Sequence, residues 1–131
     1  MQTNNKENSN LKPVILFADD DELCLDVGVQ ILQKLGYSVL RARDGQEALE
    51  VFENNKNTVD LVILDMRMPH NGGRAFDQLK QIKSDVKVLI ASGYTEDRVI
   101  RDMFEQGCVG FIQKPFSVSV LSKKITKALK N

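Results

Sequence analysis

VILFADDDELCLDVGVQILQKLG, residues 14–36, is the stretch from which the fold can be predicted. Its first five residues, Val14 to Ala18, form a short apolar run that begins with two β-branched side chains, which is typical of a buried strand. A polar turn follows, and apolar residues then recur at helical spacing in Leu23, Val27, Ile31 and Leu35. Gly36 stands where helices often end in a left-handed residue. The stretch therefore predicts a strand followed by a helix.

The same alternation of a short apolar run and an amphipathic stretch repeats along the rest of the chain. Four more runs predict strands: Tyr37 to Ala42, Leu61 to Leu64, Val86 to Ala91 and Val109 to Ile112. Between and after them, apolar residues stand at helical spacing, namely Ala48, Leu49 and Phe52; Phe76, Leu79 and Ile82; Val99, Ile100, Met103 and Phe104; and Leu121, Ile125 and Leu129. Such alternation is typical of a parallel sheet that helices cover on both faces. Five units are too few for an eight-stranded barrel, so the sequence predicts an open, doubly wound α/β fold with a five-stranded parallel sheet.

The composition fits one small domain. The chain has 131 residues, of which 42% are hydrophobic, and its 18 Lys and Arg balance its 18 Asp and Glu. A core of this size needs no disulfide or structural metal. Zero net charge and a single histidine argue against a nucleic-acid-binding surface and against a His-rich metal site.

The N-terminal stretch and the cysteines indicate where in the cell the protein acts. Residues 1–12 are almost all polar and are predicted to be a disordered leader or linker, with a folded domain at 13–131. No apolar stretch approaches the ~18 residues of a membrane span, and no secretory signal opens the chain. Cys24 and Cys108 lie far apart in the sequence. We therefore expect a reduced, cytoplasmic protein that does not itself contact a membrane.

Polar residues gather directly after the predicted strands. They are Asp19, Asp20, Asp21 and Glu22 after the first, Asp65 after the third, Ser92 and Gly93 after the fourth, and Lys114 and Pro115 after the fifth. In open parallel sheets, ligands bind outside the carboxyl ends of the strands. Asp21 and Glu22 are interpreted as a helix N-cap and a first-turn charge.

The remaining three acids predict a metal site. Asp19, Asp20 and Asp65 would meet at one edge of the sheet, where their carboxylates repel one another unless a cation lies among them. Mg²⁺ suits two carboxylates with a carbonyl and waters. Lys114 would bring a positive charge and Ser92 a hydroxyl donor to the same place, which together describe a receptacle for a phosphoryl group attached to one carboxylate.

Four segments carry a resemblance to a known family. They are VILFADDDE at 14–22, LVILDMRMPHNGG at 61–73, VLIASGY at 88–94 and GFIQKPF at 110–116. Together they resemble the receiver domain of two-component response regulators, over all of the chain from Pro13 onward. The resemblance implies a flavodoxin-like strand order 2-1-3-4-5. It also implies a cis peptide bond between Lys114 and Pro115.

The resemblance also implies a role for each site residue. Asp65 would be the phosphoacceptor, and Asp20, Asp65 and the backbone carbonyl of Arg67 would bind Mg²⁺. Asp19 would complete the acidic pocket, directly or through water. Ser92 and Lys114 would bind the phosphoryl oxygens.

The implied function is signalling rather than metabolism. The phosphoryl group would come from a phosphohistidine of a histidine kinase or a histidine phosphotransfer protein, and the chain would catalyse only its own phosphorylation and dephosphorylation. Arg67 and Tyr94 would flank the path of the hydrolytic water. Ser92 and Phe111 would act as switch residues that remodel a face made by the fourth helix, the fifth strand and the fifth helix, where a downstream protein binds.

The chain departs from the family pattern at two places. His70-Asn71-Gly72-Gly73 replaces the commoner G-x-D-G turn, and Phe111 lacks the hydroxyl of the tyrosine often found there. His70 follows Pro69 in a predicted loop, with no helix to present it, so we interpret it as a solvated loop residue and not as a phosphohistidine.

Three other functions fit the residues less well. A phosphatase of the haloacid-dehalogenase type requires D-x-D-x-[TV], which fails at Leu23, and the length leaves no room for a cap domain. A calcium loop starting at Asp19 would need glycine where Cys24 stands. A phosphorylation-independent module would lack the acceptor, a metal-binding acid or the lysine, and none is missing.

The wider context stays open between two readings. The chain could be a stand-alone receiver or the C-terminal receiver of a hybrid sensor histidine kinase, and only in the second case would histidine kinase activity belong to the whole protein. The stretch SGYTEDRVIRDMFEQGCVGFIQKPF, residues 92–116, looks more like hybrid-kinase receivers. No DNA-binding module is expected in this chain.

Overall fold

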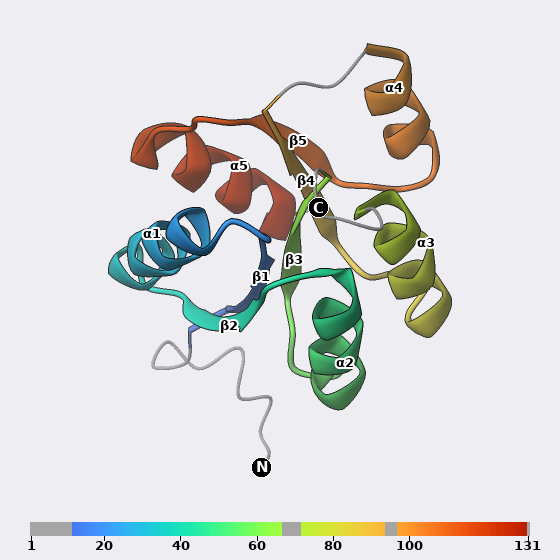
Figure 1. The fold of residues 1–131 in the computed structure, drawn as a ribbon, viewed down its shortest axis with the longest axis horizontal. Coiled ribbons are helices and arrows are strands. Elements are labelled where there is room, and N and C mark those ends of the chain that lie inside the picture. The colour runs from blue at the N-terminus through green and yellow to red at the C-terminus, as the bar shows by residue number, and fades with distance from the viewer. Residues whose placement is uncertain (1–11, 67–71, 94–96, 131) are drawn as a thin grey trace.

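The computed structural model describes residues 12–66, 72–93 and 97–130 as a five-stranded sheet between two layers of helices (Figure 1). The elements follow in the order β1 (Val14–Ala18), α1 (Glu22–Lys34), β2 (Ser38–Ala42), α2 (Gly45–Asn55), β3 (Leu61–Asp65), α3 (Gly72–Ile82), β4 (Val88–Ser92), α4 (Asp97–Glu105), β5 (Gly110–Gln113) and α5 (Val118–Lys130). All neighbouring strands are parallel, in the order β2-β1-β3-β4-β5. The predicted α/β fold and strand order are confirmed.

Helices cover both faces of the sheet, as predicted from the apolar strands. On one face, α1 and α5 pack residues such as Leu32 and Leu121 against alternate strand residues such as Ile15 and Ile63. On the other face, α2, α3 and α4 pack against the remaining strand residues, and Phe52 and Phe76 are the largest fully buried side chains of that layer. The fully buried β3 and β4 lie between the two layers, which explains why their sequences are apolar throughout.

The strand boundaries differ slightly from the predicted ones, with a consequence for the site. β3 and β4 each extend one residue further than their apolar runs. Asp65 and Ser92 are therefore the last residues of their strands, not the first residues of loops. Their backbones are fixed by the ladder between neighbouring strands, in which Asp65 is opposite Ala91 and Ser92 is opposite Gln113.

The first helix is present as predicted, but its core-facing side is not the stripe that the sequence pattern picked out. Leu23 and Val27 are 72% and 47% exposed. Leu25, Val29 and Leu32 are buried instead. Gly36 has φ of 101°, as expected of the left-handed residue after a helix.

A close contact with β1 sets the rotation of α1. A Cβ atom placed on Gly28 would lie 2.1 Å from Cε2 of Phe17, which is itself buried on β1. Glycine therefore lets the helix rest directly on the aromatic ring. Turning Leu23 and Val27 inward would move Gly28 away from Phe17.

The fourth helix, α4, buries little of its surface against the core. Met103 is its buried residue, whereas Val99 and Ile100 are half-buried and Phe104 is 47% exposed. A small apolar cavity lies under it, lined by Met66, Ile90, Val99, Ile100, Met103, Cys108 and Phe111.

Two lysines tie the amino-terminal edge of the sheet to helix ends. Lys83 Nζ donates a hydrogen bond to the carbonyl of Lys56 just beyond α2, at 3.2 Å, and Lys87 Nζ donates to the carbonyl of Leu129 in α5, at 3.0 Å. At the same edge, Asp60 accepts a hydrogen bond from the amide of Val14 at 2.7 Å.

Among the described residues, no helix is long and apolar enough to cross a membrane. Residues 1–11 of the predicted leader lie outside the described residues.

Candidate functional site

The carboxyl ends of four adjacent strands bring the predicted polar residues together. Asp19 follows β1, Asp65 and Ser92 end β3 and β4, and Lys114 follows β5. The amide of Asp19 donates to the carbonyl of Ala42 at the end of β2, so the backbone turns away only after that residue. Residues from sequence positions almost a hundred apart thus share one edge of the sheet.

The three predicted metal-binding acids form a cluster. Asp19, Asp20 and Asp65 can each place a carboxylate oxygen within 4.8 Å of the others. Asp19 and Asp65 are 2% and 1% exposed, whereas Asp20 faces solvent. Two carboxylates of the cluster are therefore buried, and the third is open to solvent.

Lys114 reaches into this cluster from the loop after β5. Its Nζ lies 2.8 Å from Oδ2 of Asp19 and 3.5 Å from Oδ2 of Asp65. Burial of the ammonium group works to lower its pKa, but the hydrogen bond to Asp19 and the negative charge of Asp65 outweigh it, so the pKa of Lys114 lies above its usual value. The Lys114–Pro115 bond is cis, as the resemblance implied, and the Lys114 amide donates to the carbonyl of Ser92 at 2.8 Å.

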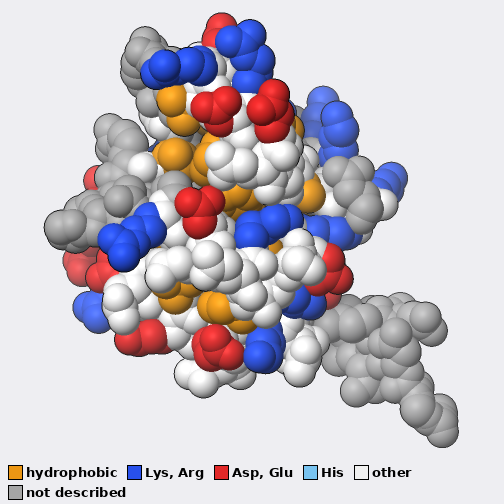
Figure 2. Space-filling view, turned by 90° about the vertical axis from the view of Figure 1, so that its right-hand side faces the viewer, with side chains coloured by type: hydrophobic (Ala, Val, Ile, Leu, Met, Phe, Trp, Pro, Cys, Tyr) orange, Lys and Arg blue, Asp and Glu red, His pale blue; other side chains and the backbone are white. Residues whose placement is uncertain are grey.

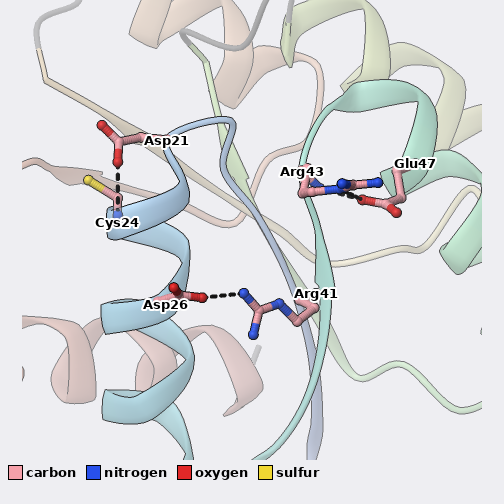
Figure 3. A network of polar contacts seen from close by, with 6 residues as sticks. All are labelled: Asp21, Cys24, Asp26, Arg41, Arg43 and Glu47. Atoms are coloured by element: carbon pink, nitrogen blue, oxygen red, sulfur yellow. Dashed lines mark hydrogen bonds and ion pairs between the residues drawn. The ribbon is translucent and has the colours of Figure 1, made fainter.

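Asp21 is the N-cap of α1, as predicted, and Glu22 begins the first turn. Figure 3 shows the Asp21 carboxylate accepting from the amide of Cys24, at 3.0 Å. This hydrogen bond is the main reason why the pKa of Asp21 lies below its usual value. The acids after β1 thus divide into a cap and two members of the cluster.

Ion pairs connect α1, β2 and α2 near the cluster. In Figure 3, Asp26 on α1 pairs with Arg41 on β2, and Arg43 after β2 pairs with Glu47 on α2. Asp44 caps α2 by accepting from the amide of Glu47 at 2.8 Å. The first pair connects α1 to β2, and the second connects α2 to the loop before it; both are exposed, so each contributes little to stability.

Comparison with known proteins places this geometry in a family. The family model described as the response regulator receiver domain matches residues 15–126. The chain belongs to the receiver domain family. It is therefore related to signal-transduction modules of two-component systems.

Named relatives include both sensor kinases and response regulators. The sensor kinase CckA of Brucella abortus is 34% identical over 116 residues, which are 88% of this chain and 12% of that protein. Response regulator RR06 of Streptococcus pneumoniae is 37% identical over 117 residues, which are 88% of this chain and 52% of that protein. A crystal structure of a CheY-like receiver domain protein from Methanospirillum hungatei superposes with a TM-score of 0.84 at 28% identity, covering 91% of this chain and 94% of that chain. This receiver domain thus spans about half of one curated relative and far less of the other.

The chemistry of the acidic cluster fits a hard divalent cation. Three carboxylates in one cluster carry more negative charge than the Lys114 ammonium balances. Both oxygens of Asp19 already accept hydrogen bonds, from the Asp21 amide at 2.9 Å and from Lys114. Carboxylate oxygens of this kind are the ligands that a hard divalent cation prefers.

The predicted switch residues lie on β4 and β5, which follow β3 in the order of the sheet. Ser92 is fully buried, and Phe111 on β5 is half-buried and packs against the layer of α2, α3 and α4. The cavity under α4 is lined in part by Phe111. The sequence did not reveal this cavity, because the residues that line it come from five separate segments of the chain. Arg67, His70 and Tyr94, to which the sequence analysis assigned a metal-binding carbonyl, a loop position and a water path, lie outside the described residues.

Proposed function

We propose that this receiver domain accepts a phosphoryl group on Asp65 from the phosphohistidine of a histidine kinase or a histidine phosphotransfer protein. The observation that carries the proposal is the position of Asp65, which is 1% exposed at the end of β3, within the acidic cluster and 3.5 Å from the Lys114 ammonium. A carboxylate is ionised at neutral pH and needs no base to become a nucleophile. Catalysis therefore reduces to positioning and charge stabilisation.

Asp20, Asp65 and the backbone carbonyl of Arg67 would hold Mg²⁺, with Asp19 directly or through water. Mg²⁺ bound there would supply positive charge to the oxygens of the transferring phosphoryl group. The burial of Asp19 and Asp65 supports this assignment, because buried carboxylates are costly and the one positive charge of Lys114 does not balance two of them.

Lys114 and Ser92 would bind the phosphoryl oxygens. Lys114 now shares its charge between Asp19 and Asp65, and a phosphoryl group on Asp65 would draw the ammonium toward its own oxygens. The Ser92 hydroxyl would donate a second hydrogen bond from the end of β4. Water would later hydrolyse the acyl phosphate, so the chain would catalyse only its own phosphorylation and dephosphorylation.

The output would be a shift between two conformations. Movement of Ser92 toward the phosphoryl group would let Phe111 turn inward and remodel the face of α4, β5 and α5, where a downstream protein would bind. The thin core contact of α4 and the cavity beside Phe111 support this step, because a helix with one buried residue moves at low cost. The phosphoryl group would shift the equilibrium by its differential interaction with the two states.

We further propose that the chain acts in the cytoplasm, with protein partners rather than nucleic acid or a membrane. The zero net charge supports this assignment, because nucleic-acid binding relies on an excess of Lys and Arg. Relatives include both a sensor kinase and a response regulator, so either a stand-alone receiver or part of a hybrid kinase remains compatible with the proposal.

Phosphorylation with a small donor tests the proposal directly. The protein is incubated with acetyl phosphate and Mg²⁺, and intact mass is measured. We expect a single phosphoryl adduct on the wild-type chain. The adduct should not form on Asp65→Asn, nor on the wild type when a chelator replaces Mg²⁺ from the start. It should still form on Asp85→Asn, which alters an exposed carboxylate away from the site. An adduct that persists in Asp65→Asn would refute the assignment of the acceptor.

A further inference from the structure

A groove outside the proposed phosphorylation site runs between α2 and α3. Its volume is about 490 Å³, and it is lined by Leu49, Glu50, Glu53, Asn54, Gln78, Gln81 and Ile82. Figure 2 views this side of the molecule, with α4 at the top, α3 in the middle and α2 at the bottom, and apolar side chains are visible between α3 and α2. The half-buried Leu49 and Ile82 supply the apolar part of the groove.

The two walls of the groove differ in charge. The α2 wall presents two exposed carboxylates, Glu50 and Glu53, whereas the α3 wall presents two carboxamides, Gln78 and Gln81. The described lining includes no Lys or Arg. The groove therefore has an apolar floor, one acidic rim and one neutral rim that can both donate and accept hydrogen bonds.

The acidic rim belongs to a helix whose own sequence does not neutralise it. Between Gly45 and Asn55, α2 has three glutamates, including Glu47, and no Lys or Arg. Glu50 and Glu53 are spaced three residues apart, so they repel each other, whereas Glu47 is paired with Arg43. Glu53 also lies near the carboxyl end of α2, where the helix dipole disfavours negative charge.

Local contacts offset this charge only in part. Glu53 lies 3.2 Å from Lys56, and Glu50 accepts from Gln46 at 3.3 Å. Both side chains of the ion pair are about half exposed, so water screens the pair and another cation can replace it. Cationic groups from outside the chain would therefore be favoured at this rim.

We infer that the α2–α3 groove binds a cationic amphipathic helix of a partner protein, with an apolar side chain over Leu49 and Ile82 and Lys or Arg side chains against Glu50 and Glu53. Helices that bind in grooves present such sets at spacings of three and four residues. Lys and Arg also suit the floor, because their aliphatic stems pack on apolar surface while the charged end reaches a carboxylate. This surface is separate from Asp65, so the inference does not depend on phosphorylation.

Amide NMR with defined peptides tests the inference on the unphosphorylated full chain. The probe is a 14-residue helical peptide of Leu, Lys and Ala with Leu on one face, and Mg²⁺ is present throughout so that the acidic cluster does not compete for the peptide. We expect shifts confined to α2 and α3, and weaker binding when the salt concentration rises from 50 to 300 mM. A peptide with Glu in place of Lys, and one with Ser in place of Leu, should each bind at least fivefold more weakly.

Variants of the chain separate the groove from general electrostatic attraction. Glu50→Gln with Glu53→Gln should weaken binding of the Lys peptide by about fivefold, the effect of two exposed ion pairs. The matched control, Asp102→Asn with Glu105→Gln, removes two charges from exposed residues of α4 and should leave binding unchanged. Charge reversal, Glu50→Lys with Glu53→Lys, should make the groove bind the Glu peptide instead.

Three outcomes would overturn the inference. One is equal binding by the Gln variant and the control, and another is a set of shifts centred outside α2 and α3. The third is salt-dependent self-association of the wild-type chain in sedimentation velocity that Glu50→Gln with Glu53→Gln abolishes. In that case the groove would bind a second copy of this chain, whose α5 carries four exposed lysines, and not a separate cationic partner.

Discussion

Lys114 is the residue on which the acidic cluster depends in the conformation described here. Its side chain is only 13% exposed, and its single positive charge lies beside two carboxylates, Asp19 after β1 and Asp65 at the end of β3. Asp19 receives the shorter contact and Asp65 the longer one. Asp20, in contrast, is in solvent and meets the other two acids only at the open side of the cluster. The three acids therefore differ in what their removal should do.

Loss of the lysine should be costly to stability. Lys114→Met would remove the ammonium group that lies against the buried carboxylates of Asp19 and Asp65, and we expect the free energy of unfolding to fall by about 3 kcal/mol at neutral pH. Urea denaturation measures the change. Lys56→Met, which breaks the exposed pair with Glu53, is the control and should cost less than about 1 kcal/mol. Equal effects in the two variants would show that the buried pairs carry no special weight.

Loss of the exposed acid should act in the opposite direction. Asp20→Asn keeps the shape of the side chain and removes one of three mutually repelling charges, so without Mg²⁺ the protein should gain about 0.5 kcal/mol of stability. The same variant should bind Mg²⁺ at least tenfold more weakly, because an amide oxygen is a poorer ligand than a carboxylate. Thermal melts and a Mg²⁺ titration measure both quantities. A less stable variant with unchanged metal affinity would mean that Asp20 serves the helix and not a metal.

At the scale of elements, the contact between α1 and β1 has the tightest geometry. Alanine normally stabilises a helix relative to glycine by about 1 kcal/mol. At Gly28 the added methyl would meet the ring of Phe17 at 2.1 Å, in a part of the core where Phe17 is only 2% exposed. Neither the ring nor the helix can move without disturbing its neighbours, so the usual sign should reverse.

Gly28→Ala should destabilise the protein by about 1–3 kcal/mol. Chemical denaturation gives the value, and the double variant with Phe17→Leu should recover part of the loss, since the smaller side chain frees space. Gly45→Ala is the matched control. A Cβ there would meet Ala75 Cβ at 3.4 Å, an ordinary contact, and we expect no loss. A stabilised Gly28→Ala protein would contradict the packing described for α1.

The same helix illustrates what the sequence can and cannot predict. The strand, the helix and its glycine end follow from local patterns, as do the acids and the lysine at the strand ends, because parallel strands align their carboxyl ends. The rotation of α1 does not follow, since Leu23 with Val27 and Leu25 with Val29 have the same spacing. Packing against Phe17 decides between them. The sharing of Lys114 between Asp19 and Asp65 and the groove between α2 and α3 also depend on distances across elements, which no local pattern contains.

For the whole molecule, metal binding and folding should be linked. Asp20 follows the first strand and Asp65 ends the third, so a metal held between them would exist only in the folded chain. We expect Mg²⁺ at ten times its dissociation constant to add about 1.4 kcal/mol to the free energy of unfolding, which is a rise of a few degrees in Tm. Differential scanning calorimetry with and without a chelator measures the shift. Asp20→Asn should show almost none of it, and an equal shift in that variant would place the metal elsewhere.

The position of β1 inside the sheet, with a strand on each side, has a mechanical consequence. This strand is hydrogen-bonded to β2 on one side and to β3 on the other, and its first amide is also held by Asp60. A force applied at Pro13 acts along the strand axis and loads both ladders at once in shear. A force applied at Lys130 reaches α5, which is attached by side-chain packing and by the hydrogen bond from Lys87 to the carbonyl of Leu129, and which can peel away one turn at a time. In a single-molecule pulling experiment, the chain should therefore resist tension at its amino-terminal side more strongly than at its carboxy-terminal side.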